Sequence, residues 1–298
     1  MIPRLDDYAL SVPASLREAL DDLARHPDAR PFAGGTDLMV VLEAGHLPAG
    51  RYVSLQHCRA LHGVNDMEGG GVSIGALTTY TEIRNSPRLA RDYPLLGLAA
   101  RETGGVATQN RGTIGGNIAN ASPAADTPPV LLVYDAELEL ASSPGTRRVP
   151  YASFHRGYKK MDLRPGELIA RVDLPAKGGS YAEGGSHEYY RKVGTRRAQA
   201  ISKVCFAGLI DVEAGVVRDV RIALGSVAPT VIRASRTEEA LRGGALDATT
   251  IAAAERTLLS EIAPIDDIRS TARYRARVAA NLLLEFLVSS RRYNSGHH

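Results

Sequence analysis

Apolar residues recur along this chain at two spacings, one typical of helices and the other typical of strands. Over residues 13–24 they repeat every three or four positions, and Ser15 and Glu18 have the spacing of a capping box, which predicts an amphipathic helix. Apolar and polar residues alternate over 136–140, and a mainly apolar run fills 168–174, so both segments are predicted strands. Both periods in one chain predict a fold that mixes helices and strands.

The same criteria predict further elements in the first part of the chain. Strands are predicted over 30–33, 51–55 and 71–76, and helices over 38–42, 81–86, 94–100 and 126–134. Pro128 and Pro129 fall in the first turn of the last of these helices, where a missing N–H group costs little. Because these elements do not alternate as regularly as in a doubly wound sheet, the predicted fold class is α+β.

A Gly-rich stretch over 176–186 marks the predicted boundary between two domains. Beyond it, strands over 207–212 and 216–224 are joined by a predicted hairpin turn, and two helical segments follow. Four residues of the last helix predict a packing stripe at successive i+4 positions: Tyr274, Val278, Leu282 and Phe286. We therefore predict domains over 1–177 and 186–291, and a tail over 292–298 whose final His-His is typical of an expression-tag remnant.

Composition narrows the class of protein. The chain has 298 residues, of which 44% are hydrophobic and 23% charged, as expected for a soluble globular protein with room for two domains. A net charge of +3 gives no electrostatic case for nucleic-acid binding, and no stretch is long and apolar enough to span a membrane. Cys58 and Cys205 are too few to ligate a metal or an iron–sulfur cluster, and the N-terminus lacks a signal peptide, so we expect a cytoplasmic protein without a metal site.

Two Gly-Gly pairs carry the strongest chemical signal. Gly34-Gly35 lies between a predicted strand and a predicted helix, and Gly115-Gly116 lies in the segment 113–126, which is dense in small polar residues. Paired glycines let backbone N–H groups approach an anion closely. A single Gly-Gly pair is as typical of an ordinary turn as of an anion-binding loop, but the two pairs together favour a dinucleotide held from two sides. The chain has neither a Rossmann fingerprint nor a P-loop, which favours FAD over ATP.

The remaining reactive side chains do not form a catalytic pattern. Cys205 stands in an apolar run and is predicted to be a buried core thiol, and His155 and His187 are isolated. The aromatic and basic cluster over 189–197 fits two interpretations equally well, a cover for a flavin and an edge strand with solvated arginines. Any redox chemistry must therefore be carried by a cofactor, and no catalytic residue is assigned.

The glycine segments have a specific resemblance. Ala33-Gly34-Gly35-Thr36-Asp37-Leu38, taken with Thr113-Ile114-Gly115-Gly116-Asn117, resembles the paired FAD-pyrophosphate loops of the flavoprotein subunits of molybdenum hydroxylases, the xanthine dehydrogenase and carbon monoxide dehydrogenase medium subunits. The resemblance extends over nearly the whole chain, through segments 121–126, 154–160, 166–169, 192–201, 223–230 and 270–275.

This resemblance implies an α+β fold with an FAD-binding domain of the PCMH type. Its two α/β subdomains would cover about 1–55 and 56–177, followed by a C-terminal domain with a small antiparallel sheet and helices. The residues implied to bind FAD are Pro31, Phe32, Ala33, Gly34, Gly35, Thr36, Asp37, Leu38, Thr103, Thr113, Ile114, Gly115, Gly116, Asn117, Asp126, Ile169 and Lys192. Leu38 would lie near the flavin ring and Asp126 would bind a hydroxyl-rich part of FAD, and the alignment leaves Arg191 as an alternative to Lys192.

The resemblance further implies an electron-transfer subunit that carries FAD. Its partners would be a small subunit with [2Fe–2S] clusters and a large subunit with the molybdenum cofactor, arranged as a dimer of heterotrimers. Thr103 replaces an aromatic residue that some members place against the flavin, so the stacking and redox tuning of the flavin stay open. Ala198-Gln199 replaces an acidic residue of NAD-reducing members, so the electron acceptor stays open. A stand-alone FAD oxidase and a non-enzymatic nucleotide-binding module are the alternatives, and the organic substrate is not specified by this chain.

Overall fold

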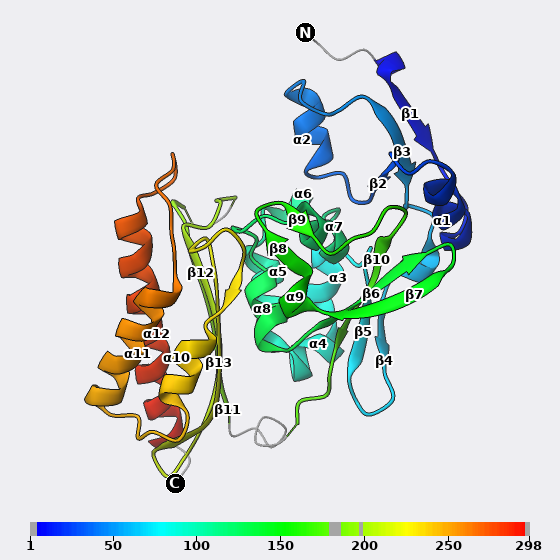
Figure 1. Ribbon diagram of the computed structural model, residues 1–298. Helices are drawn as coiled ribbons and strands as arrows, with labels where there is room; N and C mark the ends of the chain where they lie inside the picture. The colour runs from blue at the N-terminus through cyan, green and yellow to red at the C-terminus, as the bar shows by residue number, and fades with distance from the viewer. Residues whose placement is uncertain (1–4, 179–185, 197–198, 296–298) are drawn as a thin grey trace.

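The computed structural model describes residues 5–178, 186–196 and 199–295. Most of the Gly-rich boundary predicted over 176–186 therefore lies outside the described residues, as do Arg197, Ala198 and the final His-His. The described chain forms three larger sheets and one two-stranded sheet, with helices between and beside them (Figure 1). The predicted fold class, α+β with a small C-terminal antiparallel sheet and helices, is confirmed.

The first sheet is parallel and has the strand order β1-β3-β2, with β1 at Tyr8–Ser11, β2 at Arg30–Phe32 and β3 at Gly50–Ser54. Helix α1 (Leu16–Arg25) joins β1 to β2, and α2 (Leu38–Glu43) joins β2 to β3. Ser15 caps α1 as predicted, because its side chain accepts a hydrogen bond from the Glu18 N–H at 3.2 Å. These elements place the first Gly-Gly pair directly after β2.

The second sheet is antiparallel, with the order β4-β5-β10-β6-β7. Its strands are β4 (Val64–Asp66), β5 (Val72–Gly75), β6 (Glu137–Ser142), β7 (Gly145–Pro150) and β10 (Leu168–Leu174). The helices that accompany it are α3 (Tyr80–Asn85), α4 (Pro87–Asp92), α5 (Pro94–Glu102), α6 (Val106–Gln109), α7 (Ile114–Asn120), α8 (Pro128–Val133) and α9 (Tyr151–Phe154). The short pair β8 (His155–Gly157) and β9 (Lys160–Met161) follows α9.

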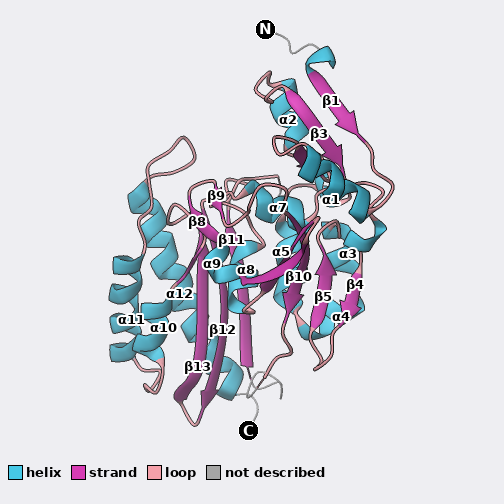
Figure 2. Cartoon of the chain, turned by 45° about the vertical axis from the view of Figure 1, so that its right-hand side comes forward, coloured by secondary structure: helices cyan, strands magenta, loops and turns pink. Residues whose placement is uncertain are grey.

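The third sheet is antiparallel, with the order β11-β12-β13-β14 (Figure 2). Its strands are β11 (Ser186–Val193), β12 (Val204–Glu213), β13 (Val216–Gly225) and β14 (Ile232–Arg233), and its helices are α10 (Ser235–Leu241), α11 (Ala248–Glu261) and α12 (Ala272–Ser295). Strand β11 is an edge strand, as one interpretation of segment 189–197 predicted. The predicted stripe on the last helix holds for Val278, Leu282 and Phe286, but Tyr274 is 43% exposed.

The third sheet is covered on both faces. Residues 204–211 of β12 are all buried, although the strand alternates its side chains between two environments. Ala207 and Leu209 pack into the core of the second sheet and its helices, whereas Phe206 and Ile210 pack against α10–α12. On the first of these faces lies α8, every residue of which is buried. The C-terminal domain therefore completes the core of the domain before it.

A capping box of Thr79 and Glu82 stabilises the start of α3. The Thr79 side chain accepts from the Glu82 N–H at 3.2 Å, and the Glu82 carboxylate accepts from the Thr79 N–H at 2.7 Å. Replacing Thr79 by alanine leaves the Glu82 N–H without its acceptor, so we expect the free energy of unfolding to fall by about 1 kcal/mol. Urea denaturation measures this change. Thr249→Ala, at an exposed position in the first turn of α11, should change stability by less, and equal losses in the two variants would contradict the prediction.

Candidate cofactor site

The first glycine loop leaves β2 and enters α2 with its amides unused. Among the described residues, the backbone N–H groups of Gly34, Gly35 and Thr36 donate to no acceptor. Gly35 has φ +75°, a left-handed conformation that favours glycine. A Cβ atom added to Gly34 would lie 1.9 Å from the backbone oxygen of Arg111. This loop therefore offers several amide donors and is closed on one side by the chain around Arg111.

The second glycine pair lies in a helix rather than in a loop. Segment 113–126 was predicted as an anion-binding loop, but it contains α7, whose inner face carries the buried Ile114 and Ile118. Thr113 is the N-cap of α7, and its side chain accepts from the Gly116 N–H at 3.1 Å. The Gly115 N–H donates to the Ala76 oxygen at 2.8 Å. These amides are engaged within the protein, so the expectation of two loops with free amides is met only by the first.

Gly115 is needed for close packing. A Cβ atom at this position would lie 2.6 Å from the Cβ and 2.8 Å from the oxygen of Ala76. Ala76 is in turn joined to β10, because its N–H donates to the Ala170 oxygen at 2.9 Å. Ile169, the preceding residue of β10, is 6% exposed. Ala76 thus connects Gly115 to Ala170 of β10, the residue after the predicted Ile169, a contact that the sequence does not predict.

The two glycine segments contact each other across about a quarter of the sequence. The Arg111 Nε atom donates to the Gly34 oxygen at 3.3 Å, and the Asn120 side-chain amide donates to the Asp37 carboxylate at 3.2 Å. A Cβ atom on Gly116 would point toward Ala33, at 3.9 Å from its Cβ. The prediction that both Gly-Gly pairs face one ligand is therefore compatible with the fold.

Asp126 lies in a buried charge cluster formed by both domains. It is 7% exposed, and its carboxylate accepts from Lys192 Nζ at 2.7 Å and from Ser202 Oγ at 2.5 Å. Lys192 Nζ also donates to the Glu102 backbone oxygen at 2.7 Å. Burial raises the pKa of Asp126, and the charge of Lys192 and the hydrogen bonds from Lys192 and Ser202 oppose that shift. The carboxylate is held as an ion pair at a site that disfavours an isolated charge.

The structure distinguishes Lys192 from its neighbour. Along β11 successive side chains point to opposite faces, and Lys192 points inward whereas Arg191 is exposed. Thr103 is the C-cap residue of α5, next to Glu102 in the sequence, and is 8% exposed. Its hydroxyl donates to the Ala99 oxygen at 2.8 Å, so it is turned back to its own helix. Of the two candidates, Lys192 is the one that meets Asp126.

Sequence reasoning missed Ser202. This residue is 1% exposed and lies between β11 and β12, in the C-terminal domain. A lone serine carries no spacing signal, and its partner Asp126 is 76 residues away. Cys205, by contrast, is a buried free thiol as predicted, and burial raises its pKa. Its Sγ atom lies 3.7 Å from the Asp126 backbone oxygen.

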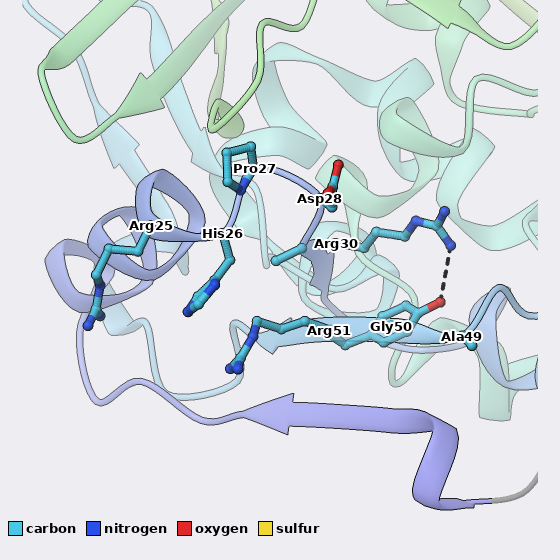
Figure 3. Close-up of a pocket in the computed structure, with 10 residues that line it drawn as sticks. Arg25, His26, Pro27, Asp28, Arg30, Ala49, Gly50 and Arg51 are labelled. Atoms are coloured by element: carbon cyan, nitrogen blue, oxygen red, sulfur yellow. Dashed lines mark hydrogen bonds between the residues drawn. The ribbon is translucent and has the colours of Figure 1, made fainter.

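A separate cavity lies at the far end of the first sheet (Figure 3). It measures about 460 Å³ and is lined by the end of α1 and the starts of β2 and β3, with Arg25, Arg30, Arg51 and Tyr52 among its residues. The Arg30 guanidinium donates to the Tyr52 hydroxyl at 3.3 Å. Because the first glycine loop follows the opposite end of β2, this cavity is distinct from the glycine site. Within the described ranges, no helix has the length and apolar character of a membrane span.

The buried position of His155 leads us to expect that the folded protein is less stable at acidic pH. Its Nε2 donates to the Ile118 oxygen of α7 at 2.9 Å, and burial lowers its pKa although that hydrogen bond acts in the opposite direction. The unfolded chain, with a histidine pKa near 6.5, then binds more protons than the folded chain, so stability is full above about pH 6.5 and is lost as the pH falls through the folded-state pKa.

We therefore expect the free energy of unfolding, measured in urea, to decrease from pH 7 to pH 5 and to decrease less in His155→Gln. The exposed His57 provides a control, since His57→Gln should keep the wild-type slope. Burial also lowers the pKa of His187, so some slope should persist in the His155 variant. A wild-type slope in His155→Gln would show that His155 does not contribute.

Comparison with known proteins gives two family matches that together span most of the chain. Residues 6–177 match the FAD binding domain in molybdopterin dehydrogenase, and residues 188–290 match the CO dehydrogenase flavoprotein C-terminal domain. The first match alone covers more than half of the chain. Both descriptions agree with the family that the glycine segments resemble.

Individual relatives agree with these matches. The xanthine dehydrogenase FAD-binding subunit of Escherichia coli O157:H7 is 31% identical over 262 residues, with 88% of each chain covered. The glyceraldehyde dehydrogenase medium chain of Sulfolobus acidocaldarius is 32% identical, with 91% of this chain and 94% of the relative covered. Among solved structures, a carbon monoxide dehydrogenase chain from Hydrogenophaga pseudoflava has a TM-score of 0.90 at 28% identity and covers 98% of this chain, with 99% of its own length matched. The chain therefore belongs to the family of FAD-binding medium subunits of the molybdenum hydroxylases, of the xanthine and carbon monoxide dehydrogenase type, and is an FAD-dependent oxidoreductase subunit.

Proposed function

We propose that this chain transfers electrons from [2Fe–2S] clusters of a small partner subunit, through FAD, to an external acceptor. A large partner subunit would hold the molybdenum cofactor and oxidise the organic substrate, and the whole would be a dimer of heterotrimers. The observation that supports this proposal is the pair of family matches, one over each domain. The unused amides of the first glycine loop suit the pyrophosphate of FAD. Cys58 and Cys205 are both free thiols, which supports a cytoplasmic location.

We infer that the first glycine loop holds the FAD pyrophosphate. Its Gly34, Gly35 and Thr36 amides have no acceptor among the described residues, and this is the chemistry that a pyrophosphate satisfies. Pro31 and Phe32 at the end of β2, and Asp37 and Leu38 at the start of α2, would flank the proposed pyrophosphate site. Bound FAD would supply one- and two-electron exchange, and the protein would supply binding and orientation.

We infer that α7 lies on the other side of the proposed pyrophosphate site, opposite the first glycine loop. Thr113 and Gly115 fix the start of that helix against Ala76, and Gly116 leaves room opposite Ala33. Asn117 is held by the Thr127 hydroxyl, which donates to its side-chain oxygen at 2.8 Å. The part-exposed Gly116 and Asn117 would thus meet the cofactor, whereas Thr113, Ile114 and Gly115 would support them.

The remaining site residues form the inner end of the proposed cofactor site. Asp126 would accept hydrogen bonds from FAD hydroxyl groups, because each carboxylate oxygen has a second acceptor position beyond its bond to Lys192 or Ser202. Ile169 and Thr103 would line the cofactor. We also propose the domain limits 1–177, with subdomains over about 1–55 and 56–177, and 186–291, with 292–298 as a tail.

Co-purification tests the proposed function. The gene is expressed with its neighbouring reading frames in its native host, and flavin, iron and molybdenum are measured in the complex that contains this chain. We expect one flavin per chain, two partner subunits, and reduction of the flavin when the organic substrate reduces the complex. Flavin without iron or molybdenum partners, combined with substrate oxidation by the chain alone, would instead indicate a stand-alone oxidase. Absence of flavin would refute an electron-transfer role.

A further inference from the structure

We propose that Ser202 is a positioning residue, and that the C-terminal domain uses it with Lys192 to hold Asp126 in the orientation that binds FAD. This inference rests on the proposed role of Asp126 in the cofactor site. The Ser202 hydroxyl donates to one carboxylate oxygen at 2.5 Å, and Lys192 donates to the other at 2.7 Å. With both oxygens fixed, the carboxylate cannot rotate, and its free acceptor positions have a defined direction.

Ser202 is itself held rigidly by its surroundings. The Ser226 hydroxyl donates to the Ser202 oxygen at 2.8 Å, and the Arg275 guanidinium donates to the oxygens of Lys203 at 2.9 Å and Ser226 at 3.1 Å. Arg275 is 3% exposed and is paired with Asp267 at 2.8 Å. The buried Arg275 thus holds the backbone at Lys203 and Ser226, the two residues next to Ser202 in sequence and in hydrogen bonding. Such support is expected where a site needs exact geometry.

The end of β13, which holds Ser202 through Ser226, also contacts the segment that carries Asp126. The Ser226 N–H donates to the Pro123 oxygen at 2.7 Å, three residues before Asp126. A Cβ atom on Gly225 would lie 3.2 Å from that oxygen and 3.5 Å from the Ala125 oxygen, so the two segments approach closely. The side chain and the backbone of the Asp126 segment are therefore both held from the C-terminal domain.

The charged and titratable side chains around Asp126 determine how its protonation depends on pH. Lys192 and Tyr190 face Asp126 from β11, Cys205 from β12, Glu102 from the end of α5 and Tyr80 from α3. Of these groups, Lys192 favours the carboxylate and Glu102 opposes it. The hydrogen bond from Ser202 lowers the pKa of Asp126, so its loss must raise that pKa. Without Ser202, Asp126 takes up a proton at a higher pH.

FAD titration of the apoprotein, followed by flavin fluorescence from pH 5 to pH 9, tests the proposal on the full chain. We expect Ser202→Ala to weaken FAD binding about tenfold at pH 7, as for the loss of one hydrogen bond to a charged group. Its loss of affinity in acid should begin at a higher pH than in the wild type. Ser290→Ala removes another fully buried hydroxyl, which donates to the Leu287 oxygen in α12, and should leave the affinity and its pH dependence unchanged.

A second variant covers the case in which Ser202→Ala fails to fold. Ser202→Cys keeps a donor at the same position, although sulfur is larger than oxygen and the thiol is a weaker donor, so we expect it to show the same shift in pH dependence with a smaller loss of affinity. Wild-type affinity and pH dependence in both variants would overturn the role of Ser202 while leaving the FAD site intact. If the wild-type chain itself does not bind FAD, the proposed function fails and not only this inference.

Discussion

Replacing Gly34 by alanine should release FAD from the purified protein. The added Cβ would lie 1.9 Å from the Arg111 oxygen and 2.8 Å from its carbonyl carbon, well inside any real contact distance, and both are backbone atoms that cannot rotate away. The first glycine loop must then move off the chain that precedes α7. Loss of two amide hydrogen bonds to a charged pyrophosphate, each contributing about 1.5–3 kcal/mol, would weaken FAD binding by about a hundredfold or more.

Fluorescence titration of apoprotein with FAD measures this loss, and Gly97→Ala provides the matched control. Gly97 lies in α5, and a Cβ atom there would meet nothing within 4 Å. Because alanine is the better helix former, this variant should bind FAD normally and be more stable by about 0.5–1 kcal/mol. Retention of FAD by Gly34→Ala at wild-type affinity would refute the assignment of the first loop. A similar loss in both variants would point to a general sensitivity of the chain.

Replacing Lys192 by methionine should both destabilise the protein and abolish FAD binding. Methionine keeps the length of the side chain but leaves the Asp126 carboxylate buried beside a neutral neighbour, and breaking such a pair typically costs about 3–5 kcal/mol. The Glu102 backbone oxygen loses its donor as well. Urea denaturation of the apoprotein measures the loss of stability.

A double variant separates the two effects of Lys192. Lys192→Met with Asp126→Leu removes both charges, and replacing a buried ion pair by apolar residues is often neutral for stability. We therefore expect the double variant to recover most of the stability that Lys192→Met loses, yet still to fail in FAD binding. If the double variant binds FAD, the carboxylate has no role in the site. If Lys192→Met is as stable as the wild type, the pair contributes no stability.

The sequence predicted the parts of the fold that local patterns determine. The β12–β13 hairpin, the cap of α1 and the burial of Cys205 follow from residues close together in the chain. Helix α7 was missed because its adjacent Gly115 and Gly116 disfavour a helix by about 1 kcal/mol each. Burial of Ile114 and Ile118 outweighs that preference.

The proposed site can be read from the sequence where one segment determines its chemistry, but not where two domains meet. The turn after β2 determines the direction of the backbone N–H groups in the first loop, and the Gly-Gly pair in the sequence predicts that turn. Whether Gly115 presents its N–H to a ligand or to Ala76 depends on where β5 ends beside α7, which no local spacing encodes. Ser202 reaches Asp126 only after the third sheet has docked.

The double coverage of β12 has a consequence for biosynthesis. Ala207, Leu209 and Ala223 belong to the core that the FAD-binding domain builds around α8, although they follow residue 177 by thirty positions or more. A ribosome that has released only the first domain has therefore released a chain whose α8 is not covered. We therefore expect α8 to complete its packing, and FAD to bind, only after β12 and β13 have emerged, so that the two regions that match separate family models fold together.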